Sequence, residues 1–476
     1  MSPANNRRPA HTSAGRHRLT PTERDMIRLV QEPGYRRWYE QIRSIGGCSH
    51  PIYLSGRTTT LHATSGAVLR HYDTTGEPGG RLAVRCRNRR ESRCVPCSRL
   101  HSGDTFHLVR SGLQGGKGTP AAVTAHPRLF VTLTAPSFGP VHRATRDGAP
   151  CRPRRDARRC SHGKRLGCGL THAPDERLVG QPICPGCYDY SGHVLWHAHT
   201  GELWNRTTRT IRRRLAAATG IPQSRIGEHL RLSFAKVAEY QRRGAVHFHA
   251  VIRLDGPDGP ASPPPAWATA ELLASAVRSA AASVEVHTPY VPGLGEHVFR
   301  WGVQLDVHPI RRAFSDESPV TDHAVAAYVA KYVSKSIGDV GGTDRPVTSP
   351  DDIALLPVSA HIRALMGTCW RLGRLTALAH LRLRAWTHTL GYRGHVLTKS
   401  RRYSTTYGEL QATRAAHRAG PDAPHTAAAE AITESSWRYV GSGHTAAEAA
   451  IAAGIAEDLA ELRAARSEGL LGEGRS

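Results

Sequence analysis

Residues 229–256 read HLRLSFAKVAEYQRRGAVHFHAVIRLDG, a pattern that predicts two β-strands joined through the short loop QRRG. Successive side chains of a strand point to opposite faces of the sheet, so His247 and His249 share one face while Phe248 packs on the other. Two neighbouring imidazoles on one face can bind one metal ion. A pair of hydrogen-bonded sheet histidines is the structural alternative.

The length of the loop decides whether this hairpin offers a third ligand. With a three-residue loop, 242–244, whose glycine takes the left-handed position of a bulge, Glu239 lies directly opposite His247 on the same face. A two-residue turn would put Glu239 on the other face. The glycine favours the longer loop. We therefore expect His247, His249 and Glu239 to form a site for Mg²⁺ or Mn²⁺ that can also accept phosphate oxygens and water.

A second His-x-His pair, His197 and His199, is an internal control for this argument. The apolar residues around it recur at helical spacing over roughly residues 191–219. On a helix, side chains two positions apart point in directions that differ by about 200°. These two rings cannot bind one ion together. We expect them on the surface or in the core of a helix.

A later segment, SPVTDHAVAAYVAKYVSKSIGD, predicts a helix that begins after Thr321 and ends near Gly338. One apolar stripe along this helix consists of Val325, Ala326, Val329, Ala330, Val333 and Ile337. Tyr328 and Tyr332 are four residues apart, so both phenols lie on one edge of that stripe.

Lys331 and Lys335 flank the two phenols and can hold a phosphate or favour a phenolate. A phenol has a pKa near 10 and is a poor nucleophile at neutral pH unless a cation or a base assists it. A metal ion held on the sheet opposite would draw charge off a scissile phosphate. The structural alternative is a pair of amphipathic core tyrosines with solvated lysines.

The composition points to a polyanionic partner. The chain has 476 residues, with 64 Lys and Arg against 39 Asp and Glu, a net charge of +25 and a pI near 10.3. Such an excess suits nucleic acid, although a high-GC genome also raises the arginine content. No apolar stretch approaches the roughly 20 residues of a membrane helix, and the basic N-terminus has no hydrophobic segment behind it. We expect a cytoplasmic protein without a membrane partner.

The ten cysteines point to metal binding rather than to disulfides in such a compartment. They include two CxxC pairs, each with a proline or glycine that helps form the tight turn presenting two thiolates to one tetrahedral zinc ion. We expect two structural Zn²⁺ ions. Their ligands would be Cys48, Cys86, Cys94 and Cys97 for the first, and Cys160, Cys168, Cys184 and Cys187 for the second.

Five further side chains bear on this ligand assignment. His50, Cys151, His162 and His172 are alternatives for one zinc ligand each. The isolated Cys369 is expected to be a small buried residue.

The order of predicted elements indicates the fold class. From residue 129 the chain predicts strand, helix, strand, strand, helix, strand, helix, beginning with RLFVTLTAPSFG. This order is typical of an α+β protein with a ferredoxin-like, split βαβ antiparallel sheet. The second cysteine block, 151–188, interrupts this order as an insertion.

The sequence resembles the HUH endonucleases, which are named for a His-hydrophobic-His motif. In this chain the motif is HFH at 247–249. RLFVTLTAPSFG resembles their first motif, and YVAKYVSKS resembles the two-tyrosine third motif of rolling-circle initiators. The resemblance is closest to the replication initiators of actinobacterial plasmids and integrative elements, the RepSA proteins. It extends to RNRRESRCVPC, CPGCYDY and KSRRYSTT.

The resemblance implies a nuclease and strand transferase that acts on origin DNA, both duplex and single-stranded. Tyr332 would attack a phosphodiester, form a 5′-phosphotyrosine link and free a 3′-OH for a host DNA polymerase. Tyr328 would make the second cleavage, and Lys331 or Lys335 would steady the phosphate. The sequence has no GxxxxGK[ST] motif, so a host helicase would unwind the duplex. The alternatives are a conjugative relaxase or transposase of the same chemistry, and a non-catalytic zinc-stabilised DNA-binding regulator.

These features divide the chain into five expected regions. They are a disordered basic N-terminus (1–25), a first zinc region (26–120), the HUH endonuclease domain with its zinc insertion (121–340), a helical and basic DNA-binding region (355–418) and a C-terminal helix (430–476).

Overall fold

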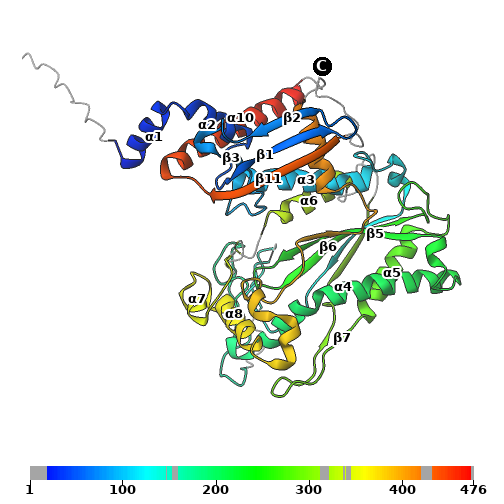
Figure 1. Cartoon of the computed structure of the whole chain (residues 1–476). Coiled ribbons are helices and arrows are strands. Elements are labelled where there is room, and N and C mark those ends of the chain that lie inside the picture. Colours follow the sequence, from blue (N-terminus) through cyan, green and yellow to red (C-terminus); the bar gives the residue numbers. More distant parts are fainter. Residues whose placement is uncertain are drawn as a thin grey trace, which may run out of the picture. The chain divides into compact units, whose positions relative to one another are not determined.

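The computed structural model describes most of the chain (Figure 1). The described residues are 19–472 without 146, 153–158, 311–320, 336–337, 339–342, 344 and 420–430. The chain folds as two compact units. Unit 1 consists of the residues up to 88, residues 93–97 and the residues from 424 onward. Unit 2 consists of residues 89–92 and 98–423.

Unit 1 is built on an antiparallel sheet in the order β11-β1-β2, with β3 also paired to β1. Helices α2 and α10 contribute buried side chains to its core, among them Trp38, Ile42 and Ile455. The elements of unit 1 are α1 (Pro21–Gln31), α2 (Tyr35–Ser44), β1 (Ile52–His62), β2 (Val68–Asp73), η1 (Pro78–Gly80), β3 (Leu82–Val84), β11 (Ala431–Ser442) and α10 (Ala446–Gly472).

The two ends of the chain differ from the sequence-based expectation. Strand β11 was missed: it pairs with β1 from end to end, but nearly all its side chains are exposed, so no apolar alternation marks it. At the N-terminus, residues 1–18 lie outside the described part of the chain. The expected disorder does not extend to residue 25, because α1 begins at Pro21 with a capping box formed by Thr20 and Glu23.

Unit 2 is built on a five-stranded antiparallel sheet in the order β10-β5-β6-β4-β9. Its strands are β4 (Arg128–Leu133), β5 (Arg231–Tyr240), β6 (Val246–Asp255), β9 (Leu305–Pro309) and β10 (Leu397–Lys399), and β7 (Val286–His287) pairs with β8 (Val298–Phe299) in a separate ladder. Strand β7 therefore lies outside the main sheet.

The helical segments of unit 2 are α4 (Tyr190–Thr219), α5 (Ala270–Ser283), α6 (Asp322–Val333), α7 (Pro350–Leu355), α8 (Ala360–Leu372), α9 (Tyr407–Ala419), η2 (Ala121–Ala125), η3 (Pro185–Cys187), η4 (Ile226–Glu228), η6 (Thr376–Leu381) and η7 (Leu383–Thr389), and α3 (Val95–Gln114) starts at the last residues assigned to unit 1. Within the described residues, no helix combines the length and apolar character needed to cross a bilayer.

Helices cover both faces of the five-stranded sheet (Figure 1). One face, which carries Phe248 and Val131, packs against α4 and α5. The opposite face, which carries Val237 and Val251, packs against α3 and α6. Because side chains alternate along β6, His247 and His249 point to the second face, under α6.

The hairpin of β5 and β6 has the predicted three-residue loop. Gly244 has φ +78°, and the N–H of Gln241 donates to the carbonyl of Ala245 at 2.8 Å. Glu239 is consequently paired with His247, which confirms the predicted register.

The control pair lies in α4, as predicted. His197 is buried, its Nδ1 lies 2.9 Å from the carbonyl oxygen of Leu390, and its Nε2 accepts the N–H of Val246 at 3.0 Å. The His197 ring therefore holds the start of β6 in place, and its role is structural.

The segment 392–417, expected to form part of a basic DNA-binding region, is partly built into the core of unit 2. Strand β10 pairs with β5, and Tyr403 is completely buried with its hydroxyl donating to the carbonyl of Val109 at 3.1 Å. Only part of its basic surface, such as Arg393 and Arg401, faces solvent. Deleting this segment would therefore remove core contacts as well as charge.

Lys236 on β5 is an unusual feature of the α4 face of the sheet. Its side chain is buried against the rings of Phe248 and Trp204, with the ammonium nitrogen 3.8 Å and 5.4 Å from the ring centroids. Among the described residues no carboxylate pairs with it. Burial lowers the pKa of Lys236 from 10.5 to about 7 because desolvation disfavours the ammonium form.

We expect Lys236→Met to stabilise the protein in a pH-dependent way. Between pH 7 and 10.5 the unfolded lysine binds its proton and the folded one does not, so the stability of the natural protein rises with pH over this range. Below pH 7 the fold carries the full cost of the charge, and the variant should gain on the order of 3 kcal/mol after allowance for cation–π attraction. Thermal unfolding at pH 6.5 and 9.5 measures this, and a gain that did not shrink at pH 9.5 would contradict it.

Candidate functional site

The paired histidines and the hairpin carboxylate form one cluster on the α6 face of the sheet. Oε2 of Glu239 lies 2.8 Å from Nε2 of His247 and 3.0 Å from Nε2 of His249, and the two Nε2 atoms are 3.2 Å apart. The side chains of His247 and Glu239 keep 15% and 17% of their surface exposed, so the cluster is open on one side. Three ligand atoms this close can share one divalent cation and leave positions for other oxygens.

Strand β4 orients the inner histidine. Oγ1 of Thr132 lies 3.1 Å from Nδ1 of His249, and the ring of Phe130 stacks on the imidazole at 5.9 Å with an interplanar angle of 6°. These contacts direct Nε2 of His249 toward Glu239. Both residues belong to the segment RLFVTLTAPSFG. Their contacts with the ring of His249 were not predicted.

The electrostatics of the cluster suit a cation. Burial alone raises the pKa of Glu239, but the hydrogen bonds from His247 and His249 outweigh it and hold the pKa at about 2. Burial lowers the pKa of His249, although Glu239 opposes the shift. At neutral pH the cluster therefore offers an ionised carboxylate and an unprotonated His249 imidazole, the forms that bind metal.

Helix α6 brings the two tyrosines over this cluster. Thr321 caps the helix through the N–H of Ala324, as predicted. The hydroxyl of Tyr328 lies 3.1 Å from Nε2 of His249, and the rings of Tyr328 and Tyr332 are 4.5 Å apart. Burial raises the pKa of Tyr332, and the nearby Glu239 raises it further while a hydrogen bond with Tyr328 lowers it.

The two lysines lie beside Tyr332. The ammonium nitrogens of Lys335 and Lys331 are 4.7 Å and 5.9 Å from the centroid of its ring. The helix ends at Val333, earlier than the expected stop at Gly338, so Lys335 follows the last turn instead of lying on it. The predicted stripe residue Ile337 lies outside the described residues.

A buried ion pair fixes the start of α6 to the sheet. The guanidinium of Arg128 on β4 donates to the carboxylate of Asp322 at 2.8 Å and to the carbonyl of Leu113 at 2.6 Å. Both charged side chains are buried. This contact was not predicted, because Asp322 in the sequence resembles an ordinary acidic residue of a first helical turn.

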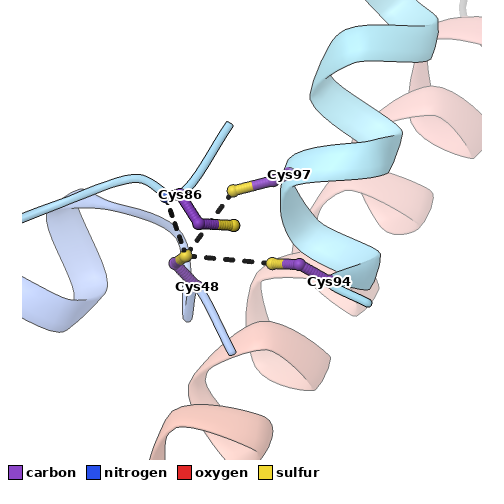
Figure 2. A group of neighbouring side chains, drawn as sticks. All are labelled: Cys48, Cys86, Cys94 and Cys97. Atoms are coloured by element: carbon purple, nitrogen blue, oxygen red, sulfur yellow. Dashed lines mark hydrogen bonds between the residues drawn. The ribbon is translucent and has the colours of Figure 1, made fainter. Parts of the chain in front are cut away.

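The first expected zinc cluster is assembled in unit 1. Cys48 follows α2, Cys86 follows β3, Cys94 immediately precedes α3 and Cys97 lies in its first turn, and their side chains point toward one another in Figure 2. Sγ of Cys48 is 3.8 Å from Sγ of Cys94 and 3.6 Å from Sγ of Cys97. Such spacings fit four thiolates around one tetrahedral ion with metal–sulfur distances of about 2.3 Å.

The second expected zinc cluster is divided between two groups. Cys168, assigned by sequence to the group of Cys160, instead lies 3.3 Å from the imidazole of His172. We call the first group the Cys160 cluster and the second the Cys151 cluster. The Cys160 cluster consists of Cys160, His162, Cys184 and Cys187, and the Cys151 cluster of His142, Cys151, Cys168 and His172.

Three members of these two clusters were predicted as alternative zinc ligands, and one member was not predicted. His162, Cys151 and His172 were alternatives, while His142 was not considered because it lies before the cysteine block. The remaining alternative, His50, is in none of the groups found among the described residues, and Cys369 is buried as expected. Cys168 and His172 meet His142 and Cys151 from an earlier turn of the chain, and cysteine spacing alone does not show which turns meet.

The fold and these clusters define an α+β protein built on antiparallel sheets, with groups of cysteine and histidine that could hold metal ions. A family model described as RepSA, replication initiator protein, pSAM2, matches residues 34–457. A replication initiator protein of Streptomyces ambofaciens is 45% identical over 446 residues, which cover 91% of this chain and 93% of the relative. The chain therefore belongs to the RepSA family of replication initiator proteins. No solved structure matches it.

Proposed function

We propose that this chain is a rolling-circle replication initiator that nicks and rejoins single-stranded DNA at a plasmid or integrative-element origin through a 5′-phosphotyrosine intermediate. The observation that carries the proposal is the 3.1 Å approach of the Tyr328 hydroxyl to His249, within the cluster of His247, His249 and Glu239. A nucleophile and a cation site lie in one place, as a metal-assisted phosphoryl transfer requires.

The topology of unit 2 supports an HUH-type core. Strands β4, β5, β6 and β9, with α4 and α5 on the connections, follow the chain order of a split βαβ fold. In the sheet they lie in the order β5-β6-β4-β9, with the last strand beside the first as in ferredoxin-like sheets. The HFH motif occupies a central strand of this arrangement.

In the proposed reaction the phenolic oxygen of Tyr332 attacks the phosphorus of the scissile phosphodiester. The new O–P bond forms while the P–O3′ bond breaks, the phenol loses its proton to solvent and the departing 3′ oxygen takes one up. A divalent cation bound by His247, His249 and Glu239 would draw negative charge from the phosphate oxygens. Lys331 and Lys335 would hold the phosphate beside the phenol.

Tyr328 would make the second cleavage after one round of copying. The phosphotyrosine ester conserves the energy of the phosphodiester, so a 3′-OH can attack it and restore a closed strand. The proximity of the two rings supports this alternation, because one strand end could remain on Tyr332 while the second phenol acts at the same cation site.

The proposed partners follow from charge and from what the sequence lacks. A net charge of +25 suits origin DNA, both duplex and single-stranded. A host helicase would open the duplex and a host DNA polymerase would extend the 3′-OH. The zinc clusters and the exposed arginines of segment 392–417 are candidates for duplex binding.

The test is recovery of a covalent adduct. Supercoiled plasmid carrying the origin is incubated with the protein and Mn²⁺, and the digested complex is analysed by mass spectrometry for a nucleotide on the peptide with Tyr328 and Tyr332. We expect nicked plasmid and a 5′-linked adduct. Bound but unnicked DNA would favour the non-catalytic regulator instead, and an adduct on another residue would overturn the proposed site.

A further inference from the structure

The segment between β4 and α4 arranges its metal-binding side chains in alternating pairs. Along the chain, the first and third pairs belong to the Cys151 cluster, and the second and fourth pairs belong to the Cys160 cluster. In order, the pairs are His142 with Cys151, Cys160 with His162, Cys168 with His172, and Cys184 with Cys187.

We propose that the four ligand pairs between His142 and Cys187 form a cross-braced module that binds two zinc ions, one in each cluster, so that the chain holds three structural zinc ions instead of two. In such a module neither ion is bound by a continuous stretch of chain. Each cluster closes a loop that contains ligands of the other, and the two ions stabilise the fold together.

The Cys151 cluster has the features of a built metal site. Cys151 is completely buried, and Cys168 and His172 are 8% and 4% exposed. Nε2 of His172 lies 3.3 Å from Sγ of Cys168 and 3.2 Å from Nδ1 of His142. The separations match a tetrahedral ion with two thiolates and two imidazoles at about 2.0–2.3 Å.

Two further contacts orient these side chains within the cluster. The other ring nitrogen of His172, Nδ1, lies 2.9 Å from the carboxylate of Glu176, which fixes the ring and leaves Nε2 for a metal. The backbone N–H of Arg143 donates to Sγ of Cys151 at 3.2 Å.

Backbone hydrogen bonds bring the alternate pairs together. His142 donates to Gln181 at 2.9 Å and accepts from Gly180 at 2.8 Å. Cys151 donates to Leu170 at 2.7 Å and accepts from Gly169 at 2.9 Å. The contacts of Cys151 hold the first pair beside the third across the Cys160 turn. The contacts of His142 hold the start of the segment beside the residues that precede Cys184.

The module also touches the hairpin that carries the nuclease site. The guanidinium of Arg242, in the loop between β5 and β6, donates to the carbonyls of Asp175 and Glu176 at 3.1 and 3.2 Å. Glu176 is the residue whose side chain orients His172. The Cys151 cluster therefore supports the loop whose register sets Glu239 opposite His247.

Zinc counting tests the proposal without using nuclease activity. Native mass spectrometry is applied to the His247→Ala/His249→Ala protein, in which the nuclease site cannot retain zinc. We expect three zinc ions per chain. Two ions in this parent would overturn the third site, whatever the outcome of the nicking assay.

A variant pair then tests the cross-bracing. In the same background, Cys151→Ser/Cys168→Ser should hold at most two zinc ions, whereas the matched control Cys369→Ser, outside every cluster, should keep three. Alkylation of Cys187 during a chelator titration reports on the Cys160 cluster. We expect half-alkylation at a chelator concentration about tenfold lower in the double variant. Retention of three ions, or unchanged Cys187 protection, would overturn the module.

Discussion

Replacing both phenols, by Tyr328→Phe and Tyr332→Phe together, is expected to abolish the covalent DNA adduct and to lower origin nicking by about three orders of magnitude or more. The reason is that only binding and charge stabilisation remain when the nucleophile is removed. The substitution deletes two oxygens and keeps both rings, so the packing of α6 against the sheet should survive. Gel analysis of nicked plasmid and an adduct assay measure the two losses.

The single variants separate the roles of the two phenols. We expect Tyr332→Phe to block the first cleavage and Tyr328→Phe to permit it but to stop release of a closed circle. Tyr290→Phe is the matched control, since Tyr290 is 66% exposed and lies outside the cluster. Adduct formation that persisted in the double variant would show that the strand is carried elsewhere, and equal effects of the two single variants would refute the proposed order.

The hairpin could be predicted because its determinants are local. One glycine that tolerates φ +78° selects the loop, the loop selects the register, and the register places Glu239 opposite His247. The same holds for α6, where a threonine cap and a four-residue spacing set the tyrosines on one edge. These inferences need only the chemistry of neighbouring residues.

Features that depend on distant residues could not be predicted. Strand β11 is held by pairing with a strand from the opposite end of the chain, and its exposed side chains carry no periodic signal. The contact of Arg128 with Asp322 likewise joins two elements far apart in the sequence. Cys168 was placed in the wrong group because spacing shows that cysteines can share an ion but not which turns meet.

Removing one charge from the proposed cation site should have a different signature from removing the phenols. Glu239→Gln keeps the size of the side chain and loses the carboxylate, whose pKa of about 2 keeps it ionised at any working pH. We expect the apparent affinity for Mn²⁺ to fall about 10- to 100-fold and nicking at low metal to fall with it. His247→Ala should behave similarly, because its ring lies 2.8 Å from the same carboxylate oxygen.

The decisive measurement is rescue by metal. Nicking by Glu239→Gln should recover substantially as Mn²⁺ is raised, since the phenols remain in place and only occupancy of the site is reduced. The double tyrosine variant should not recover at any concentration, because no cation can replace a nucleophile. A matched control, His287→Ala, removes an exposed imidazole that pairs with Glu285 on a separate ladder and should leave the metal titration unchanged. If Glu239→Gln titrated with Mn²⁺ like the natural protein, this carboxylate would be a structural partner of the two histidines, and the cation would have to be bound without it.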